Sequence, residues 1–284
     1  IRDAQESRGL GDVYKRQIEV RELNKNYGCH KILKGLNFQI VKGEIFALLG
    51  VNGAGKTTTL ECVEGLRKYD EGTIIVNGKM GIQLQSSSLP AHIKPMEAIK
   101  LFAKWNHTKI DDDMLKALEI KKIEKLQYLQ LSTGQKRRLH LALALIGNPD
   151  IIFLDEPTAG LDVEARLSLH EHIRNLKSQG KTIILASHDM AEVETLCDRI
   201  AILNSGKIVF CGTPSELTDK VGRRYYIYLK TQEGVKSFET TNIEDTLISL
   251  LNECKQKKIQ ILDIKVDRGT LEQHFIEMAR RGSE

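Results

Sequence analysis

Gly50-Val51-Asn52-Gly53-Ala54-Gly55-Lys56-Thr57 is the stretch that decides the fold of this 284-residue chain. It follows the apolar run Glu44–Leu49 and precedes Thr57–Leu66, which has helical spacing. Glycines let the backbone pass close to a phosphate, and the free amides at a helix N-terminus attract negative charge. The order of strand, glycine-rich loop and helix therefore predicts a phosphate-binding loop and disfavours a plain glycine-rich turn.

Two carboxylates follow a second apolar run, Ile151–Leu154. In a phosphate-binding site, Asp155 would orient a magnesium shell that includes the Thr57 hydroxyl, and Glu156 would act as a general base toward water. Lys56 would reach the terminal phosphates. An acidic pair after a strand is also a common helix cap, so this interpretation depends on the glycine-rich loop.

The pattern along the chain alternates between strands and helices. Thr73–Val76 is predicted to be a strand that the turn dipeptide Asn77-Gly78 closes into a hairpin. Residues 86–146 are predicted to be mainly helical, and Thr182–Ala186 to be a buried strand after a helix over Val163–Ser178. Alternation of this kind predicts an α/β fold with a largely parallel sheet.

Composition and charge exclude several classes of protein. The chain is 41% hydrophobic and 28% charged, as in ordinary globular proteins. Its longest apolar runs fall far short of the ~20 residues of a membrane-spanning helix. A net charge of +4 gives no sign of a dedicated nucleic-acid surface, so nucleic acid is not an expected partner. The five cysteines have no CxxC spacing, which indicates neither a zinc site nor a disulfide framework.

Leu131-Ser132-Thr133-Gly134-Gln135 closely resembles the signature motif of ATP-binding cassette (ABC) proteins. The family has a glycine where Thr133 stands here. The resemblance implies that Ser132, Gly134 and Gln135 contact the γ-phosphate of ATP bound to another protomer. In physical terms, Ser132 would cap a helix whose dipole favours that negative charge.

Other segments resemble the remaining ABC motifs in the order of the family. Gln85 resembles the glutamine that contacts magnesium and water, with Gln83 as a weaker alternative, and His188 resembles the switch histidine. Ala159-Gly160-Leu161-Asp162 resembles the loop that joins two protomers. Tyr27 stands where the family places an aromatic ring against adenine, although it could also be a packed surface tyrosine.

Together these interpretations define an expected site for ATP and Mg²⁺. The expected catalytic residues are Glu156, His188, Lys56 and Gln85, and the expected magnesium ligands are Thr57, Gln85 and Asp155. The expected nucleotide-binding residues lie in or near the glycine-rich loop, the signature segment and the loop Ala159–Asp162. They are Tyr27, Asn52, Gly53, Ala54, Gly55, Lys56, Thr57, Thr58, Ser132, Gly134, Gln135 and Asp162.

The resemblance implies a cassette of the P-loop NTPase type, with a parallel-sheet core, an antiparallel β subdomain and a helical insert. We expect the ATPase domain over residues 18–216, with the insert at about 86–146, and a small C-terminal α/β domain over 217–284. Residues 1–17 are interpreted as a non-domain extension, because they show no sustained apolar periodicity.

The C-terminal segment Gly269–Phe275 resembles the ATPase subunits of ABC-2 type exporters of drugs, peptides or ions. This implies a peripheral subunit at the cytoplasmic face of the cell membrane. Its implied partners are a separate permease, docked by the helical insert, and a second cassette, identical or not. An importer motor, a cassette that acts on ribosomes or DNA, and a regulatory subunit without hydrolysis stay open as alternatives.

Overall fold

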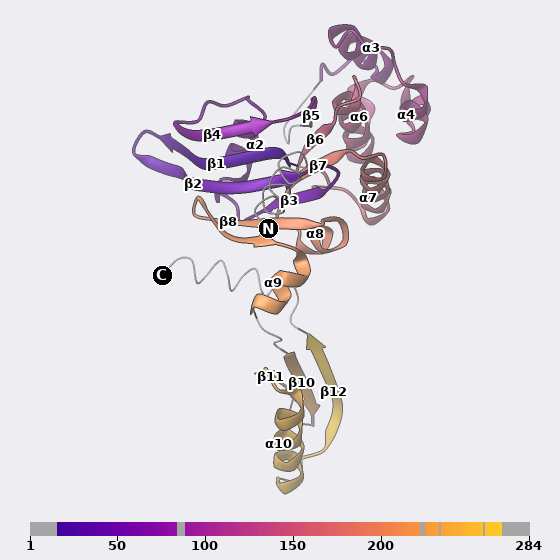
Figure 1. Cartoon of the computed structure of the whole chain (residues 1–284). Coiled ribbons are helices and arrows are strands. Elements are labelled where there is room, and N and C mark those ends of the chain that lie inside the picture. Colours follow the sequence, from indigo (N-terminus) through magenta and orange to yellow (C-terminus); the bar gives the residue numbers. More distant parts are fainter. Residues whose placement is uncertain (1–15, 84–88, 222–224, 233, 258, 269–284) are drawn as a thin grey trace, which may run out of the picture. The chain divides into compact units, whose positions relative to one another are not determined.

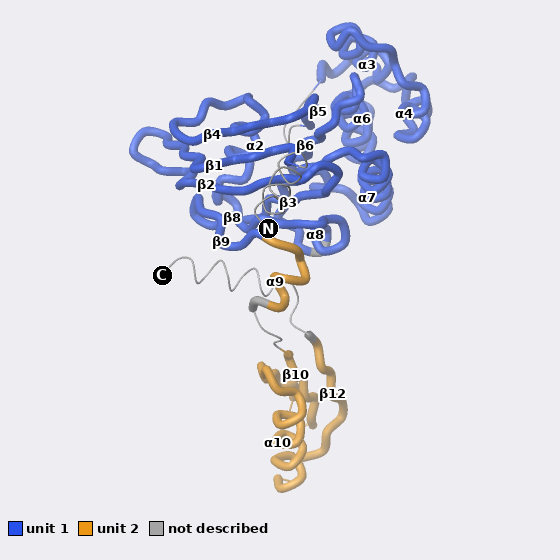
Figure 2. Tube along the Cα trace, in the orientation of Figure 1, with its two compact units in different colours: residues 1–211 blue, residues 212–284 orange. Residues whose placement is uncertain are grey.

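The computed structural model describes residues 16–83, 89–221, 225–232, 234–257 and 259–268. The chain divides into two compact units, residues 1–211 and 212–284 (Figure 2). The first unit therefore ends five residues before the expected boundary at 216. The division falls at the end of the strand Lys207–Gly212.

The first strand, β1, covers Arg16–Tyr27 and starts two residues before the expected domain boundary. Gln17 is buried, and its side chain accepts a hydrogen bond from the hydroxyl of Thr182. Its carbonyl oxygen accepts from the amide of Asn77 at 2.8 Å. Gln17 therefore belongs to the fold, because it is tied to two segments that are distant in sequence.

Strand β1 is the centre of an antiparallel sheet with order β2-β1-β4, in which β2 is His30–Val41 and β4 is Glu71–Val76. The predicted hairpin at Asn77-Gly78 is wrong. The next strand, β5 (Met80–Gln83), pairs in parallel with a strand of a different sheet. The Asp150 carboxylate accepts from the amide of Lys79 at 2.9 Å, which draws the chain away from β4.

The central sheet has six strands in the order β5-β6-β7-β3-β8-β9. The remaining strands are β3 (Ile45–Leu49), β6 (Ile151–Asp155), β7 (Thr182–Ser187), β8 (Arg199–Asn204) and β9 (Lys207–Gly212). Every residue of β3, β6 and β7 is buried, and these strands pair in parallel. The expected parallel sheet with continuously apolar strands is confirmed.

Three helices of this unit follow strands of the central sheet (Figure 1). They are α2 (Lys56–Val63), α7 (Val163–Ser178) and α8 (Met190–Leu196). The apolar core extends from the antiparallel sheet to the central one, where Phe38 and Phe46 stack with ring centroids 5.8 Å apart. This packing fixes the antiparallel sheet over the strand that leads into the glycine-rich loop.

The helical insert is built from short helices between β5 and β6 (Figure 1). They are α3 (Pro95–Trp105), α4 (Asp112–Ala117), α5 (Ile120–Ile123), a 3₁₀ turn at Tyr128–Gln130 and α6 (Thr133–Leu145). Ile99 and Ala103 are buried on one face of α3, whereas Phe102 is only half-buried. Leu101 and Trp105, one turn apart, are exposed.

The second unit begins with α9 (Pro214–Val221), followed by β10 (Tyr225–Thr231), β11 (Gly234–Thr240), α10 (Ile243–Gln256) and β12 (Ile261–Arg268). The three strands form an antiparallel sheet with order β11-β10-β12. Among the described residues of this unit, the buried apolar side chains include Ile227 and Leu229 of β10 and Leu250 and Cys254 of α10. The segment Gly269–Phe275, which resembles ABC-2 type exporter subunits in sequence, lies outside the described residues.

Gly81 of β5 tests how closely the helical insert packs on the central sheet. A Cβ atom at this position would lie 2.1 Å from the carbonyl oxygen of Ala144 in α6. Because that neighbour is backbone, Gly81→Ala should lower the free energy of unfolding by at least about 2 kcal/mol. Urea unfolding measures this change. Thr73→Ala, at an exposed position of β4, is the control and should change it by less than about 0.5 kcal/mol. An equally small effect of Gly81→Ala would contradict the packing described here.

Candidate functional site

The site lies where three parallel strands end at the same edge of the central sheet. In the pairing register Leu49 of β3 lies beside Ser187 of β7, and Asp155 of β6 lies beside Ala186 of β7. The glycine-rich loop, the acidic pair and His188 each follow one of these strand ends. The sheet therefore brings together three segments that are about 100 and 30 residues apart in sequence.

The glycine-rich loop is folded tightly between β3 and α2. A Cβ atom at Gly50 would lie 2.5 Å from the carbonyl oxygen of Leu203 in β8, so only glycine fits there. Lys56 is buried, and its ammonium group donates to the Gly50 carbonyl oxygen at 2.7 Å. Burial lowers the pKa of Lys56, and the charges of Glu156 and Asp155 oppose this effect. The loop thus holds a largely desolvated cation at its centre.

A cavity of about 290 Å³ lies over the loop. Ile32 and the predicted catalytic residue Glu156 line it, together with most of the nucleotide-binding residues predicted in and around the glycine-rich loop: Tyr27, Asn52, Gly53, Gly55, Lys56, Thr57 and Thr58. Ala54 does not line the cavity, because it is buried and its amide donates to Val51 within the loop. The Tyr27 ring is 42% exposed, and Lys25 and Arg67 lie 5.6 and 5.4 Å from its centroid.

Asp155 and Thr57 offer two oxygen ligands suited to Mg²⁺. The Thr57 hydroxyl donates to Asp155 Oδ2 at 3.1 Å, whereas Asp155 Oδ1 is buried and has no hydrogen-bond partner. Burial raises the pKa of Asp155, and the hydrogen bond from Thr57 opposes this effect. Within the described residues no cluster of three His, Cys, Asp or Glu could hold a metal. A hydroxyl and a carboxylate oxygen are donors suited to an ion such as Mg²⁺, which takes few protein ligands and several from phosphate and water.

Glu156 and His188 form a pair beside the cavity. Nδ1 of His188 lies 2.9 Å from both carboxylate oxygens of Glu156. Glu156 is buried and has a φ of 48°, a left-handed conformation that is costly for a residue with a Cβ atom. Its amide donates to the carbonyl of Ala186 at 2.9 Å, which helps to hold this conformation. Hydrogen bonding through Nδ1 leaves the other ring nitrogen of His188 free for a second contact.

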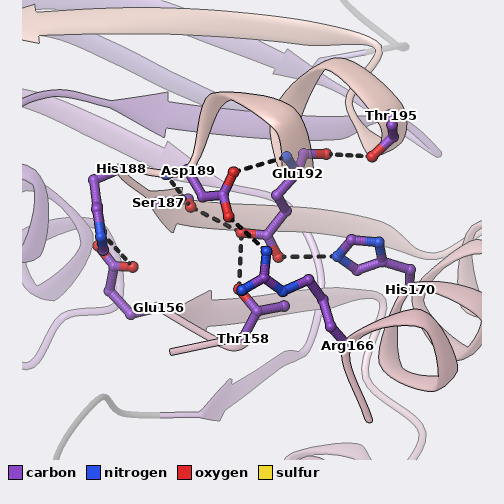
Figure 3. A network of polar contacts seen from close by, with 9 residues as sticks. All are labelled: Glu156, Thr158, Arg166, His170, Ser187, His188, Asp189, Glu192 and Thr195. Carbon is purple, nitrogen blue, oxygen red and sulfur yellow. Dashed lines mark hydrogen bonds and ion pairs between the residues drawn. The ribbon is translucent and has the colours of Figure 1, made fainter. Parts of the chain in front are cut away.

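A polar network lies beside this pair, and few local sequence patterns indicate it (Figure 3). Glu192 of α8 accepts hydrogen bonds from Ser187 and Thr158, at 2.8 and 3.1 Å. Arg166 of α7 donates to Asp189 at 3.0 Å. The spacing of Asp189 and Glu192 is that of a helix start. The contacts of Glu192 with Thr158 could not be predicted, because these residues are 34 positions apart.

The signature segment lines a second cavity of about 580 Å³. Ser132 is the N-cap of α6, as predicted, and forms reciprocal hydrogen bonds with Gln135 at 3.2 and 2.9 Å. Predicted residues Ser132, Gly134, Gln135 and Asp162 line this cavity, and the glycine-rich loop does not. One chain therefore carries two separate half-sites.

Gln85, predicted to be catalytic, lies outside the described residues. Gln83, the alternative, is buried in β5, and neither atom of its amide group has a hydrogen-bond partner.

Sequence comparisons identify relatives over nearly the whole chain. Residues 33–159 match the family model described as "ABC transporter". An uncharacterized ABC transporter ATP-binding protein of Methanocaldococcus jannaschii is 35% identical, covering 93% of this chain and 99% of the relative. The linearmycin resistance ATP-binding protein of Bacillus subtilis is 30% identical, with 93% and 98% covered. A Nod factor export ATP-binding protein of Cupriavidus metallidurans is 35% identical, with 71% and 73% covered.

The solved structures agree with the sequence comparisons. A structure described as the ATP-binding subunit of an ABC transporter matches with a TM-score of 0.65 and 26% identity, over 72% of this chain and 92% of that chain. With the matched family model and relatives that align end to end, the chain belongs to the ABC transporter family, among its ATP-binding and ATP-hydrolysing proteins.

Proposed function

We propose that this chain powers export through a separate membrane permease by hydrolysing ATP at sites shared between two cassettes. The observation that carries this proposal is the meeting of Lys56, the Thr57–Asp155 pair and the Glu156–His188 pair around one cavity. A binding-only subunit would not need an acidic base beside the glycine-rich loop. Nothing in this arrangement orients transport, so export is inferred from relatives.

Each residue of the site has a separate role in the proposed hydrolysis of ATP. Lys56 and the loop amides bind the β- and γ-phosphates, and Tyr27 stacks on adenine. Thr57 and Asp155 would hold Mg²⁺, which neutralises charge on the phosphates. Glu156 orients the attacking water and accepts its proton, and His188 keeps the Glu156 carboxylate in place.

The two half-sites support a head-to-tail pair of cassettes. The signature segment and the glycine-rich loop line different cavities of one chain, so a complete site requires the signature segment of a second chain. The N-terminus of α6 carries a partial positive charge suited to a γ-phosphate. Closure over ATP and reopening after hydrolysis would then drive the permease. The second cassette can be identical or different.

Export through a separate permease is supported by two observations. The Bacillus and Cupriavidus relatives are named for linearmycin resistance and Nod factor export. Among the described residues, no helix is long and apolar enough to cross a bilayer. We propose that the chain acts at the cytoplasmic face of the membrane.

We assign permease docking to the exposed face of α3, which carries Leu101 and Trp105.

The role of Glu156 predicts the behaviour of Glu156→Gln. An amide cannot accept the proton of water, so kcat should fall at least about 100-fold while ATP still binds. The variant should accumulate as an ATP-bound dimer, detected by size-exclusion chromatography with nucleotide analysis. Glu171→Gln, an exposed position on α7, is the control and should behave like the wild type. Unchanged turnover in Glu156→Gln would remove Glu156 from the role of base.

Asp155→Asn tests the magnesium site. The amide keeps the size of the side chain but loses the negative charge, so the Mg²⁺ concentration for half-maximal hydrolysis should rise about 10- to 100-fold. Titration of ATPase activity with MgCl₂ measures it, with Asp198→Asn, an acid outside the cavity, as the control. If the Mg²⁺ requirement stayed the same, Asp155 would not be a magnesium-side residue.

Trp105→Glu tests the docking face. Trp105 is 73% exposed at the end of α3, so the variant should fold and keep its basal ATPase activity. Its affinity for the permease should fall at least about tenfold, because large exposed aromatic residues dominate such interfaces. Binding to the reconstituted partner permease measures the effect. Ile75→Glu, at an exposed position of β4, is the control. Equal permease binding by both variants would move the docking surface elsewhere.

A further inference from the structure

Glu192 is the most deeply buried carboxylate near the site, and its side chain is 0% exposed. One of its oxygens, Oε2, accepts hydrogen bonds from two hydroxyl groups, Ser187 Oγ at 2.8 Å and Thr158 Oγ1 at 3.1 Å (Figure 3). Ser187 is the last residue of β7, directly before His188, and Thr158 lies in the segment that follows β6. A single oxygen atom therefore joins the segment that carries His188 to the segment that carries Glu156.

We propose that Glu192 is a positioning residue for ATP hydrolysis, which fixes the Glu156 segment against the His188 segment through the hydroxyls of Thr158 and Ser187. The proposal deepens the proposed function and rests on the roles given there to Glu156 and His188. Glu192 does not touch the cavity over the glycine-rich loop and acts only through these two neighbours.

Short backbone turns connect Thr158 to the residues that it would position. The amide of Ala159 donates to the carbonyl oxygen of Glu156 at 3.2 Å, and the amide of Leu161 donates to the carbonyl oxygen of Thr158 at 3.1 Å. These two turns run from the general base, Glu156, to Leu161, which lines the cavity of the signature segment. A shift of Thr158 would therefore displace Glu156 and the residues that follow Thr158 in these turns.

Ser187 has a similar place beside His188. Its hydroxyl donates to Glu192 and accepts from the amide of Asp189 at 3.0 Å, so it braces the residues on both sides of His188. Asp189 in turn accepts from Arg166 of α7 at 3.0 Å. That ion pair is partly exposed and contributes less than the buried contacts of Glu192.

The other oxygen of Glu192 faces a different part of the fold. Glu192 Oε1 lies 3.4 Å from Nε2 of His170, a buried residue of α7. Burial raises the pKa of Glu192 and lowers the pKa of His170. One oxygen thus contacts the catalytic segments and the other contacts α7, so a change of His170 removes the α7 contact and leaves the hydroxyl contacts in place.

The test compares Glu192→Leu, which removes the acceptor, with Glu192→Gln, which keeps an acceptor oxygen for both hydroxyls. His170→Leu is the matched control, because it removes the packing contact and leaves the hydroxyl contacts in place. Two quantities are measured well below the melting temperature of each variant: kcat with the affinity for a non-hydrolysable ATP analogue, and amide hydrogen exchange of the nucleotide-free chain.

Glu192→Leu should lower kcat about 10- to 100-fold with little change in analogue affinity, because small misplacements of catalytic groups are costly. Its exchange should rise in both segments, residues 156–161 and 187–190. Glu192→Gln should recover at least about a third of the wild-type kcat. His170→Leu should lower the melting temperature and raise exchange in α7 without lowering kcat.

Equal losses of kcat in Glu192→Leu and His170→Leu would overturn the proposal, as would faster exchange confined to α8. If Glu192→Leu fails to fold, Thr158→Val replaces it, since valine has nearly the same shape without the hydroxyl, and Thr158→Ser should restore kcat. Exchange is measured without ATP. A wild-type chain that never dimerised with ATP would therefore contradict the proposed function and leave the exchange result for Glu192 standing.

Discussion

The parallel register of β6, β7 and β3 is the constraint on which the site depends. These strands are buried along their whole length, so a slip of one residue would move polar residues into the core. The register places Leu49, Ser187 and Asp155 at one edge of the sheet. The glycine-rich loop, the acidic pair and the switch histidine are brought together by this pairing. Packing of Gly50 against Leu203 then fixes the loop on its other side.

Negative charge accumulates in this buried region. Asp155, Glu156 and Glu192 are all buried there, and Lys56 is the buried cation of the loop. Burial raises the pKa of Asp155 and of Glu192, because the charged form of a carboxylate loses solvation. The hydrogen bond from Thr57 and, in the proposed mechanism, Mg²⁺ offset this cost for Asp155. Hydrogen bonds from two hydroxyl groups offset it for Glu192. Asp155 therefore suits metal binding, and Glu192 suits a positioning role.

Local signals in the sequence predicted the parts of the fold that depend on local chemistry. The glycine-rich loop, the buried strands and the capping of α6 by Ser132 follow from residue type and spacing, and all three are found. The hairpin at Asn77-Gly78 was wrong, because the contact of Lys79 with Asp150 overrides the turn preference. The link from Thr158 through Glu192 to Ser187 depends on tertiary packing, so no spacing rule reveals it. The roles of the individual site residues remain predictions.

In the proposed mechanism, the site for ATP is completed only by a second cassette. The most direct measurement is the ATPase rate per chain across a dilution series, with the fractions of monomer and dimer determined by mass photometry at each concentration. The rate per chain should follow the fraction of dimer and fall toward zero where the chain is monomeric. A monomer that hydrolyses ATP at the full rate per chain would contradict it.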